Sequence, residues 1–326
     1  MSGQLRIIRP GPCSLVQDLG RPGSAHLGVA RSGAADTLSL RAGNRLVGNE
    51  DNAAAIEMTL AGLHASFDTD STVCLSGAGG DALLLDAHAK AMRRVKLLEP
   101  TRIGAGESLR IGPLKGGARG YLCIAGGVCT ATELGSRSTH AASGIGGLGG
   151  RALDAGDCLP IGTDAARPAR RIAPQARERL LAMPLCRELR ITPGPHAELF
   201  DQHAMQTLVS AAFRVSRAAD RVGVRLEQTK IPTLDPGAID SEPMLCGAIQ
   251  VTPDGTPIIL MPDGPTTGGY PVIGVVIGAD LPALGQLRPG DEIRFSPVDL
   301  ETALEALRSQ LQELDTLCPP DGPDRP

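Results

Sequence analysis

Short runs in which apolar and polar residues alternate make up most of this chain. The clearest are residues 71–78, 118–127, 223–228 and 247–262. Alternation over about four to eight residues, bounded by turn-forming residues, predicts β-strands. The run at 247–262 is interrupted by the turn sequence Pro253-Asp254-Gly255, so it predicts a hairpin. Many short strands and few helical segments predict a mainly-β fold of barrel type.

Three segments carry the spacing and end signals of helices. Residues 36–48 start at Asp36, a good N-cap, and residues 196–211 form a second candidate. Asp299 can cap a third helix, whose apolar side comes from leucines spaced four and three apart, namely Leu300, Leu304, Leu307, Leu311 and Leu314. We expect this C-terminal helix to pack on the domain before it or to dock a partner. The closing residues 318–326 are expected to lack ordered structure.

The two halves of the chain open and close with similar sequences. Residues 5–12 (LRIIRPGP) resemble 189–195 (LRITPGP), and residues 153–161 (LDAGDCLPI) resemble 287–295 (LRPGDEIRF). A repeated opening and closing predicts two related domains. We place them at residues 1–162 and 188–297, with a linker at 163–187 and a C-terminal helix and tail at 298–326.

The amino-acid composition argues against several classes of protein. The 326 residues include no Trp, two Tyr and four Phe, and the net charge is −4, so nucleic-acid binding by stacking or by a basic surface is not expected. No run of 18 apolar residues and no secretory leader occur, so we expect no membrane span and a cytoplasmic location. The eight cysteines show no CxxC spacing, so most are expected to be buried and no metal site is expected.

Common catalytic motifs are absent or out of context. Residues 144–149 (GIGGLG) match GxGxxG, but a turn and a strand are expected after them rather than a helix, so they do not predict a dinucleotide site. The chain has no GxxxxGK[ST] and no GxSxG. It is therefore not expected to hydrolyse ATP through a P-loop by itself.

The stretch at residues 262–271 (PDGPTTGGYP) concentrates groups suited to ligand binding. Thr266 and Thr267 add hydroxyls, and Gly268 and Gly269 let main-chain N–H groups approach a ligand closely. Tyr270, one of only two tyrosines, offers an apolar wall with a polar tip. A tight turn alone would explain the glycines but not the whole set. We predict that this loop lines a substrate site.

Other polar loops supply further candidates, although each can also be explained by turn formation or helix capping. The aperiodic loop at 17–36 contains Gln17, Arg21, His26 and Ser32; residues 135–140 contain Ser136, Arg137 and Ser138; and residues 216–221 contain Asp220. An Arg beside hydroxyls can hold a carboxylate. Glu57 lies within an apolar strand, where a carboxylate must be either paired or functional.

With these stretches in view, the chain resembles the family of the 5-oxoprolinase C subunit, also called allophanate hydrolase subunit 2 or the biotin-dependent carboxyltransferase-like family. The residues that carry the resemblance are 16–36, 44–49, 135–153, 247–255, 266–282 and 287–293. One departure is Gly264-Pro265, where the family often has a basic or amide pair. The departure bears on which substrate is bound.

The resemblance implies two cyclophilin-like β-barrel domains and two partners, an A subunit together with a small, inhibitor-like B subunit. The complex would open the lactam of 5-oxoproline to glutamate while hydrolysing ATP, with no covalently bound cofactor, and this chain alone would be inactive. Thr266, Thr267 and the glycine N–H groups would surround the amide oxygen. Arg21 or Arg137 would hold the substrate carboxylate.

The general base would be Glu57, His26 or Asp220. The remaining expected substrate-binding residues are Gln17, Ser32, Ser136, Ser138, Gln250 and Tyr270.

Two alternatives stay open at this point. The first is carboxyl transfer to a urea-like amide with carboxybiotin as donor, which would need a biotin carboxylase and a carrier elsewhere because no Met-Lys-Met occurs here. The second is a non-catalytic regulator that binds a kinase-inhibitor protein. The density of Arg and hydroxyl side chains in the loops argues against the second.

Overall fold

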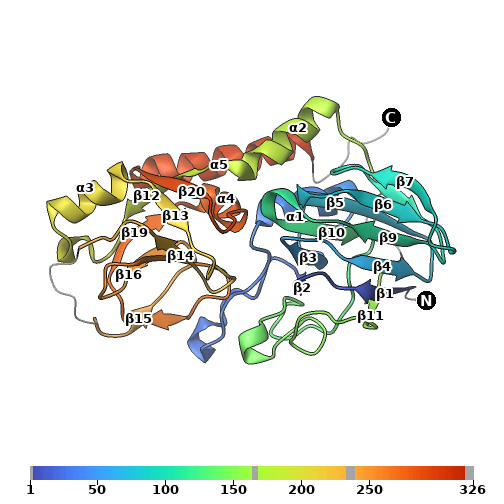
Figure 1. Ribbon diagram of the computed structural model, residues 1–326, viewed down its shortest axis with the longest axis horizontal. Coiled ribbons are helices and arrows are strands. Elements are labelled where there is room, and N and C mark those ends of the chain that lie inside the picture. The colour runs from blue at the N-terminus through green and yellow to red at the C-terminus, as the bar shows by residue number, and fades with distance from the viewer. Residues whose placement is uncertain (1–2, 164–167, 233–238, 320–326) are drawn as a thin grey trace. The chain divides into compact units, whose positions relative to one another are not determined.

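The computed structural model describes residues 3–163, 168–232 and 239–319 (Figure 1). Their contacts divide the chain into two compact units. Unit 1 comprises Met1–Arg21, Ser32–Leu185 and Glu313–Pro326, and unit 2 comprises Pro22–Arg31 and Cys186–Gln312. The domain limits and the linker drawn from sequence remain a prediction. Part of that linker, and residues 320–326 of the tail, lie outside the described residues.

Unit 1 is built from two antiparallel sheets. One sheet has six strands in the order β11 (Cys158–Ile161), β1 (Gly3–Arg9), β4 (His64–Phe67), β9 (Ser108–Ile111), β6 (Ala82–Leu85) and β7 (Ala91–Val95). The other has five in the order β2 (Ser14–Gln17), β3 (Ala55–Thr59), β10 (Lys115–Ile124), β5 (Ser71–Gly79) and β8 (Thr101–Ile103).

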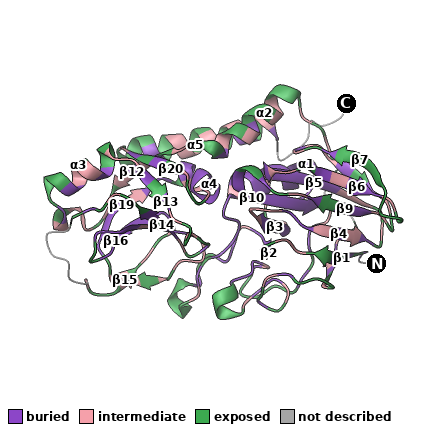
Figure 2. Cartoon of the chain, viewed as in Figure 1, coloured by how far each residue is buried: buried purple, intermediate pink, exposed green. Residues whose placement is uncertain are grey.

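The two sheets of unit 1 share one apolar core. Leu5 and Phe67 from the six-stranded sheet and Ile56 and Leu122 from the five-stranded sheet belong to a single buried cluster. Alternate residues of each strand enter this core, as the periodicity predicted. Figure 2 shows β3, β5 and β10 largely in the colour of buried residues, because helix α1 (Thr37–Leu46) covers the other face of their sheet.

Unit 2 contains a closed barrel of seven strands. Their order is β12 (Glu188–Pro193), β19 (Val272–Val276), β16 (Ala248–Val251), β17 (Pro257–Leu260), β14 (Gly223–Glu227), β13 (Phe213–Val215) and β20 (Glu292–Pro297). The parallel pair β12–β20 closes the ring, whereas the other pairs are antiparallel. Phe213 and Phe295, with ring centroids 5.4 Å apart, are buried. A separate ribbon pairs β15 (Glu242–Pro243) with β18 (Thr267–Gly268).

The mainly-β fold class is confirmed, and so is the hairpin, in which Val251 pairs with Pro257 across β16 and β17. In the described residues, unit 2 forms the closed barrel, whereas the strands of unit 1 pair as two sheets around a shared core. Isolated bridges connect these two sheets: Leu75 of β5 pairs with Leu97, just after β7, and Ile161 of β11 pairs with Val128, beyond the end of β10.

The predicted helix at Asp36 is present, and the Asp36 carboxylate accepts a hydrogen bond from the main-chain N–H of Ser39. The C-terminal helix α5 (Leu300–Leu317) is present too, capped by Asp299. The segment 196–211 differs, because extended Phe200 separates a short 3₁₀ turn from helix α3 (Gln202–Ser210). The remaining helices are α2 (Pro174–Ala182), α4 (Leu281–Gly285) and the 3₁₀ turns η1 (Ala25–Leu27), η2 (Ala141–Ser143), η3 (Met183–Leu185), η4 (Ala197–Leu199) and η5 (Gly278–Asp280).

The leucines of α5 do not all face inward. Leu314 is fully buried in unit 1 and Leu307 packs against an apolar cluster of unit 2, whereas Leu300, Leu304 and Leu311 are exposed. Within the described residues, no helix has both the length and the apolar character that a membrane span requires.

The cysteines divide by burial more evenly than expected. Cys74, Cys123 and Cys318 are buried, Cys13 and Cys246 are intermediate, and Cys129, Cys158 and Cys186 are exposed. Cys74 and Cys123 lie opposite each other on β5 and β10 under α1. Burial raises the pKa of the Cys123 thiol to about 12.

Thiol reactivity provides a test of this arrangement. Because only the thiolate reacts, we expect Ellman's reagent at pH 8 to modify the three exposed cysteines quickly and to leave Cys74 and Cys123 unmodified until the protein unfolds. A Cys129→Ser variant should lose one fast equivalent. Peptide mass spectrometry that finds Cys74 or Cys123 labelled in the fast phase would contradict the packing of α1 on β5 and β10.

Candidate functional site

The loop at residues 266–271 is held in place by main-chain hydrogen bonds from both sides. Its segment Thr267–Gly268 pairs with Glu242–Pro243, and the N–H of Met244 donates to the Thr266 carbonyl over 2.9 Å. The N–H of Ile239 donates to the Gly269 carbonyl, and that of Val251 to the Pro271 carbonyl, each over 2.9 Å. The loop is thus a fixed part of unit 2.

The two glycines of this loop allow close packing that a side chain would prevent. A Cβ at Gly268 would lie 2.6 Å from Gln250 Nε2, and one at Gly269 would lie 3.1 Å from the Ile239 carbonyl oxygen. Gln250, which is 5% exposed, donates from Nε2 to the Tyr270 carbonyl oxygen over 3.4 Å. No described residue accepts a hydrogen bond from the N–H of Gly269 or Tyr270. These two donors are available to a ligand.

An ion pair anchors the approach to the loop. Arg221 and Asp263 form two hydrogen bonds of 2.7 and 3.0 Å, and less than a tenth of either side chain is exposed. Asp263 immediately precedes the Gly264-Pro265 departure. The predicted base Asp220 is exposed, and its carboxylate accepts the N–H groups of Val222 and Gly223, which holds its own turn.

Two residues that the sequence did not single out lie beside the loop. The N–H of Val272 donates to His196 Nδ1 over 3.2 Å, and His196 Nε2 lies 2.5 Å from Glu242 Oε1. Glu242 is directly opposite Gly268 in the β15–β18 ribbon. The sequence signal was slight, because His196 was assigned to a helix start and Glu242 lies in a short segment without periodicity.

In unit 1, Asp18 organises the polar loops that the sequence singled out. Its carboxylate accepts hydrogen bonds from the hydroxyls of Ser136 and Ser138 and from the N–H of Arg137, each at 2.6 Å, and from the N–H of Gly20 at 2.8 Å. Asp18 is 3% exposed. A buried carboxylate with four donors stabilises the contact between residues 18–20 and 136–138.

The remaining polar residues of this region are also buried. Arg21 is 1% exposed, and its guanidinium donates to the main-chain carbonyls of Glu133 and Ser138. Gln17 donates from Nε2 to the Thr139 carbonyl, and its Oε1 is buried without a hydrogen-bond partner among the described residues. Ser32 has a positive φ of 53°. These side chains are buried between the loops of unit 1 and are not part of an exposed binding surface.

Glu57 is paired rather than free. Its Oε2 accepts hydrogen bonds from the Tyr121 hydroxyl over 2.8 Å and from the N–H of Ala35 over 2.9 Å, and its Oε1 lies 3.7 Å from Arg119 Nε. Burial, followed by the charges of Glu57 and Asp36, raises the pKa of Tyr121 well above its ordinary value. The tyrosine therefore stays protonated and donates to Glu57 inside unit 1.

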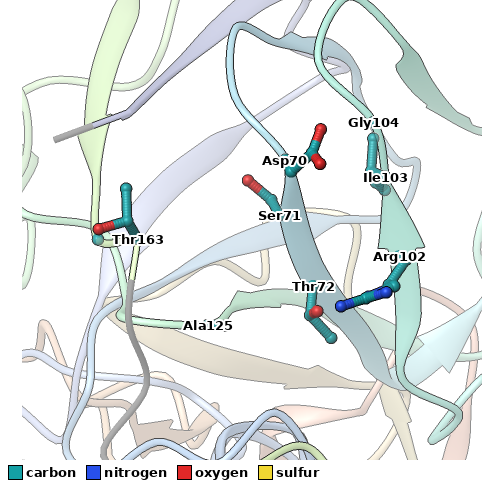
Figure 3. Close-up of a pocket in the computed structure, with 9 residues that line it drawn as sticks. Asp70, Ser71, Thr72, Arg102, Ile103, Gly104, Ala125 and Thr163 are labelled. Atoms are coloured by element: carbon teal, nitrogen blue, oxygen red, sulfur yellow. The ribbon is translucent and has the colours of Figure 1, made fainter. Parts of the chain in front are cut away.

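A pocket of about 290 Å³ opens elsewhere in unit 1. Figure 3 shows Asp70, Ser71 and Thr72 along one side of it, Arg102 on β8, and Thr163 across from them. None of the sequence-predicted site residues lines this pocket, and none of its polar side chains is buried. We therefore place the candidate site at the 266–271 loop.

The structure thus sorts the predicted site residues into separate groups. Unit 2 brings together the 266–271 loop and Gln250, and adds His196 and Glu242. Unit 1 gathers Gln17, Arg21, Ser136, Arg137 and Ser138 around Asp18, with Glu57 in a second buried network. His26 is exposed in η1, with Nδ1 2.9 Å from the Gly23 carbonyl oxygen. No cluster of His, Cys, Asp or Glu suited to a metal ion occurs in the described part of the chain.

Comparison with known proteins shows the family. The family model described as carboxyltransferase domain, subdomain A and B, matches residues 27–297. The chain is 37% identical to the 5-oxoprolinase C subunit of Escherichia coli over 96% of its length and 97% of the relative's. It is also 37% identical to the 5-oxoprolinase C subunit of Haemophilus influenzae, over 93% and 94%. Urea amidolyase of Lachancea kluyveri is 34% identical over 95% of this chain and 18% of that protein.

Two solved structures support the same family. The Kluyveromyces lactis urea amidolyase matches 96% of this chain with a TM-score of 0.87 at 29% identity, and this chain spans about a fifth (20%) of that protein. TTHA0988 matches 90% with a TM-score of 0.75 at 37% identity, and this chain spans 55% of it.

The Asp18 network can be tested by an isosteric change. Asp18→Asn removes the charge that four donors share, so we expect unit 1 to lose about 3 kcal/mol of stability. Guanidinium chloride unfolding followed by circular dichroism measures the loss. Asp154→Asn, at an exposed carboxylate, should change stability by less than about 0.5 kcal/mol. Equal stability of the two variants would show that Asp18 does not organise these loops.

Proposed function

Because the chain belongs to the carboxyltransferase domain, subdomain A and B, family, we propose that it acts as the C subunit of an ATP-dependent 5-oxoprolinase. The observation that carries the proposal is the match in length as well as sequence. The two 5-oxoprolinase relatives are covered over 97% and 94% of their length, whereas the urea amidolyase relatives contain this chain as less than a fifth of a larger protein.

In this proposal the chain works with an A subunit together with a small, inhibitor-like B subunit. The complex converts 5-oxoproline, ATP and water to L-glutamate, ADP and phosphate. No cofactor is bound covalently, and ATP is used by the complex. The chain by itself is inactive, and its location is cytoplasmic.

The 266–271 loop supplies the groups that this chemistry needs. Opening a lactam requires charge to develop on the amide oxygen, and fixed donors stabilise that charge. The hydroxyls of Thr266 and Thr267 and the N–H groups of Gly269 and Tyr270 are such donors. The support for this assignment is that the loop is rigidly hydrogen-bonded and that the last two donors have no acceptor among the described residues.

The structure changes which residues are suited to hold the substrate carboxylate and to act as the general base. Arg21 and Glu57 are buried and engaged, and Asp220 holds its own turn, so each would have to break existing hydrogen bonds to act. Arg137 is only partly buried, and His26 is exposed. Among the described residues, only the Nε of the Arg137 side chain is engaged, donating to the Thr130 carbonyl oxygen over 2.8 Å, so its terminal guanidinium nitrogens are available to a carboxylate.

Carboxyl transfer to a urea-like amide is the second candidate. It is favoured by the identity to urea amidolyases over 94–95% of this chain. In that case carboxybiotin on a separate carrier would be the donor. The third possibility, binding of a kinase-inhibitor protein without catalysis, is supported by none of the relatives named above.

Reconstitution tests the proposal directly. The purified chain, combined with A and B subunits from the same organism, should form glutamate and ADP from 5-oxoproline and ATP, and omission of any one subunit should abolish glutamate. The control is the same mixture without 5-oxoproline. An assembled complex that makes no glutamate would contradict the proposal. The next assay would then supply urea and bicarbonate together with a biotin carrier.

The glycine in the loop provides a mutational test. Gly268→Ala places a Cβ 2.6 Å from Gln250 Nε2, so the loop or the amide must move. A shift of about 1 Å in a positioning group can cost roughly 100-fold in rate, and we expect kcat/KM to fall by about 10- to 100-fold. Gly112→Ala, where the nearest atom is 3.4 Å away, is the control. Equal activity of both variants would place catalysis away from this loop.

A further inference from the structure

Glu242 projects to the same side of the β15–β18 ribbon as the buried amide of Gln250. Residues opposite each other in an antiparallel pair point to the same side, and Glu242 is opposite Gly268. The Cβ direction of Gly268 leads to Gln250 Nε2 at 2.6 Å. The carboxylate and the amide therefore lie on one side of the 266–271 loop.

His196 has its tautomer fixed by the main chain. Because the N–H of Val272 donates to Nδ1, that ring nitrogen carries the lone pair. The hydrogen of the neutral ring is then on Nε2, which lies 2.5 Å from Glu242 Oε1. The N–H side of the imidazole thus lies against Glu242, and the ring has no lone pair left to act as a base.

The Glu242 carboxylate has unused acceptor capacity. Its Oε1 is buried against His196 Nε2 without a hydrogen-bond partner among the described residues. The side chain as a whole is 38% exposed, so the exposed part is the remainder of the side chain, away from Oε1. The Oε1 end of the carboxylate lies against His196, and the other end can reach a ligand.

We propose that Glu242 accepts the N–H of the substrate's amide nitrogen and takes its proton, and that His196 is a positioning residue for Glu242. The inference rests on the function proposed above and adds a residue pair that neither a sequence motif nor a relative's name identifies. The ligand class is a small amide or lactam with an N–H beside its carbonyl.

The proton transfer balances in the proposed reaction. The lactam oxygen attacks the γ-phosphorus of ATP, an O–P bond forms and the bond to ADP breaks. As the C=O π pair moves to oxygen, the nitrogen lone pair forms the second bond of C=N. The N–H bond pair stays on nitrogen as its new lone pair, and the proton passes to Glu242. Carboxyl transfer to a urea-like amide also removes an N–H proton. The same carboxylate would serve either reaction.

The first test removes the acceptor. In the reconstituted complex, Glu242→Gln should lower kcat by about 100- to 10,000-fold, the range for loss of a general base, and change KM by less than about 10-fold. Glu198→Gln, at an exposed glutamate two residues beyond His196, is the matched control and should keep wild-type kinetics. Assembly and thermal unfolding of both variants show whether they fold. A Glu242→Gln complex within threefold of wild-type kcat would overturn the proposal.

A second pair of variants separates positioning from simple structural support. His196→Gln can keep a donor near the Nε2 position, whereas His196→Asn keeps an acceptor near Nδ1 for the Val272 N–H. If His196 acts through Glu242, the Gln variant should keep at least tenfold more kcat than the Asn variant, with similar KM. If it only supports the loop, the Asn variant should be the more active. That order would contradict the positioning role.

Binding distinguishes failure of this inference from failure of the proposed function. If the wild-type complex makes no glutamate, the proposed function fails. The inference is then tested by binding affinity, measured by calorimetric titration with 5-oxoproline and with urea. Three- to tenfold weaker binding by Glu242→Gln of whichever compound the wild type binds would support the inference. Equal affinity, or no binding of either compound, would overturn it.

Discussion

The parallel pairing of β12 with β20 closes the barrel of unit 2, and the candidate site depends on that closure. Once β12 is fixed between β20 and β19, the chain leaves β12 through Gly194, whose N–H donates to the Ile273 carbonyl over 3.0 Å. A Cβ at Gly194 would lie 2.2 Å from the Val272 carbonyl oxygen, so only glycine allows this approach. The turn brings His196 against the start of β19 and beside Glu242.

In unit 1, long polar loops are buried. Main-chain and side-chain polar groups removed from water must find partners, and Asp18 and Glu57 supply charged acceptors for several donors each. Most of the polar side chains that suggested a binding surface therefore form hydrogen bonds inside the unit. Such networks rigidify a fold because each member fixes the next.

The family relationship and the site geometry answer different questions. Identity across nearly the full length of the 5-oxoprolinase relatives establishes the family and favours one reaction. Which atoms would perform it is inferred from the donors and acceptors at the 266–271 loop. In our proposals, the N–H groups of Gly269 and Tyr270 would bind an amide oxygen, and the partly exposed carboxylate of Glu242 would accept an amide N–H.

The sequence by itself determined the fold class, the hairpin at β16–β17, the helix caps Asp36 and Asp299, and the loop with paired glycines. These follow from local periodicity and turn chemistry, which act over a few residues. It did not determine that the strands of unit 1 pair as two sheets, that Arg21 and Glu57 form hydrogen bonds inside unit 1, or that His196 contacts Glu242. Those facts depend on residues far apart in the chain, such as 196 and 242 or 57 and 121. Only the tertiary structure decides them, because burial and pairing are set by which strands become neighbours.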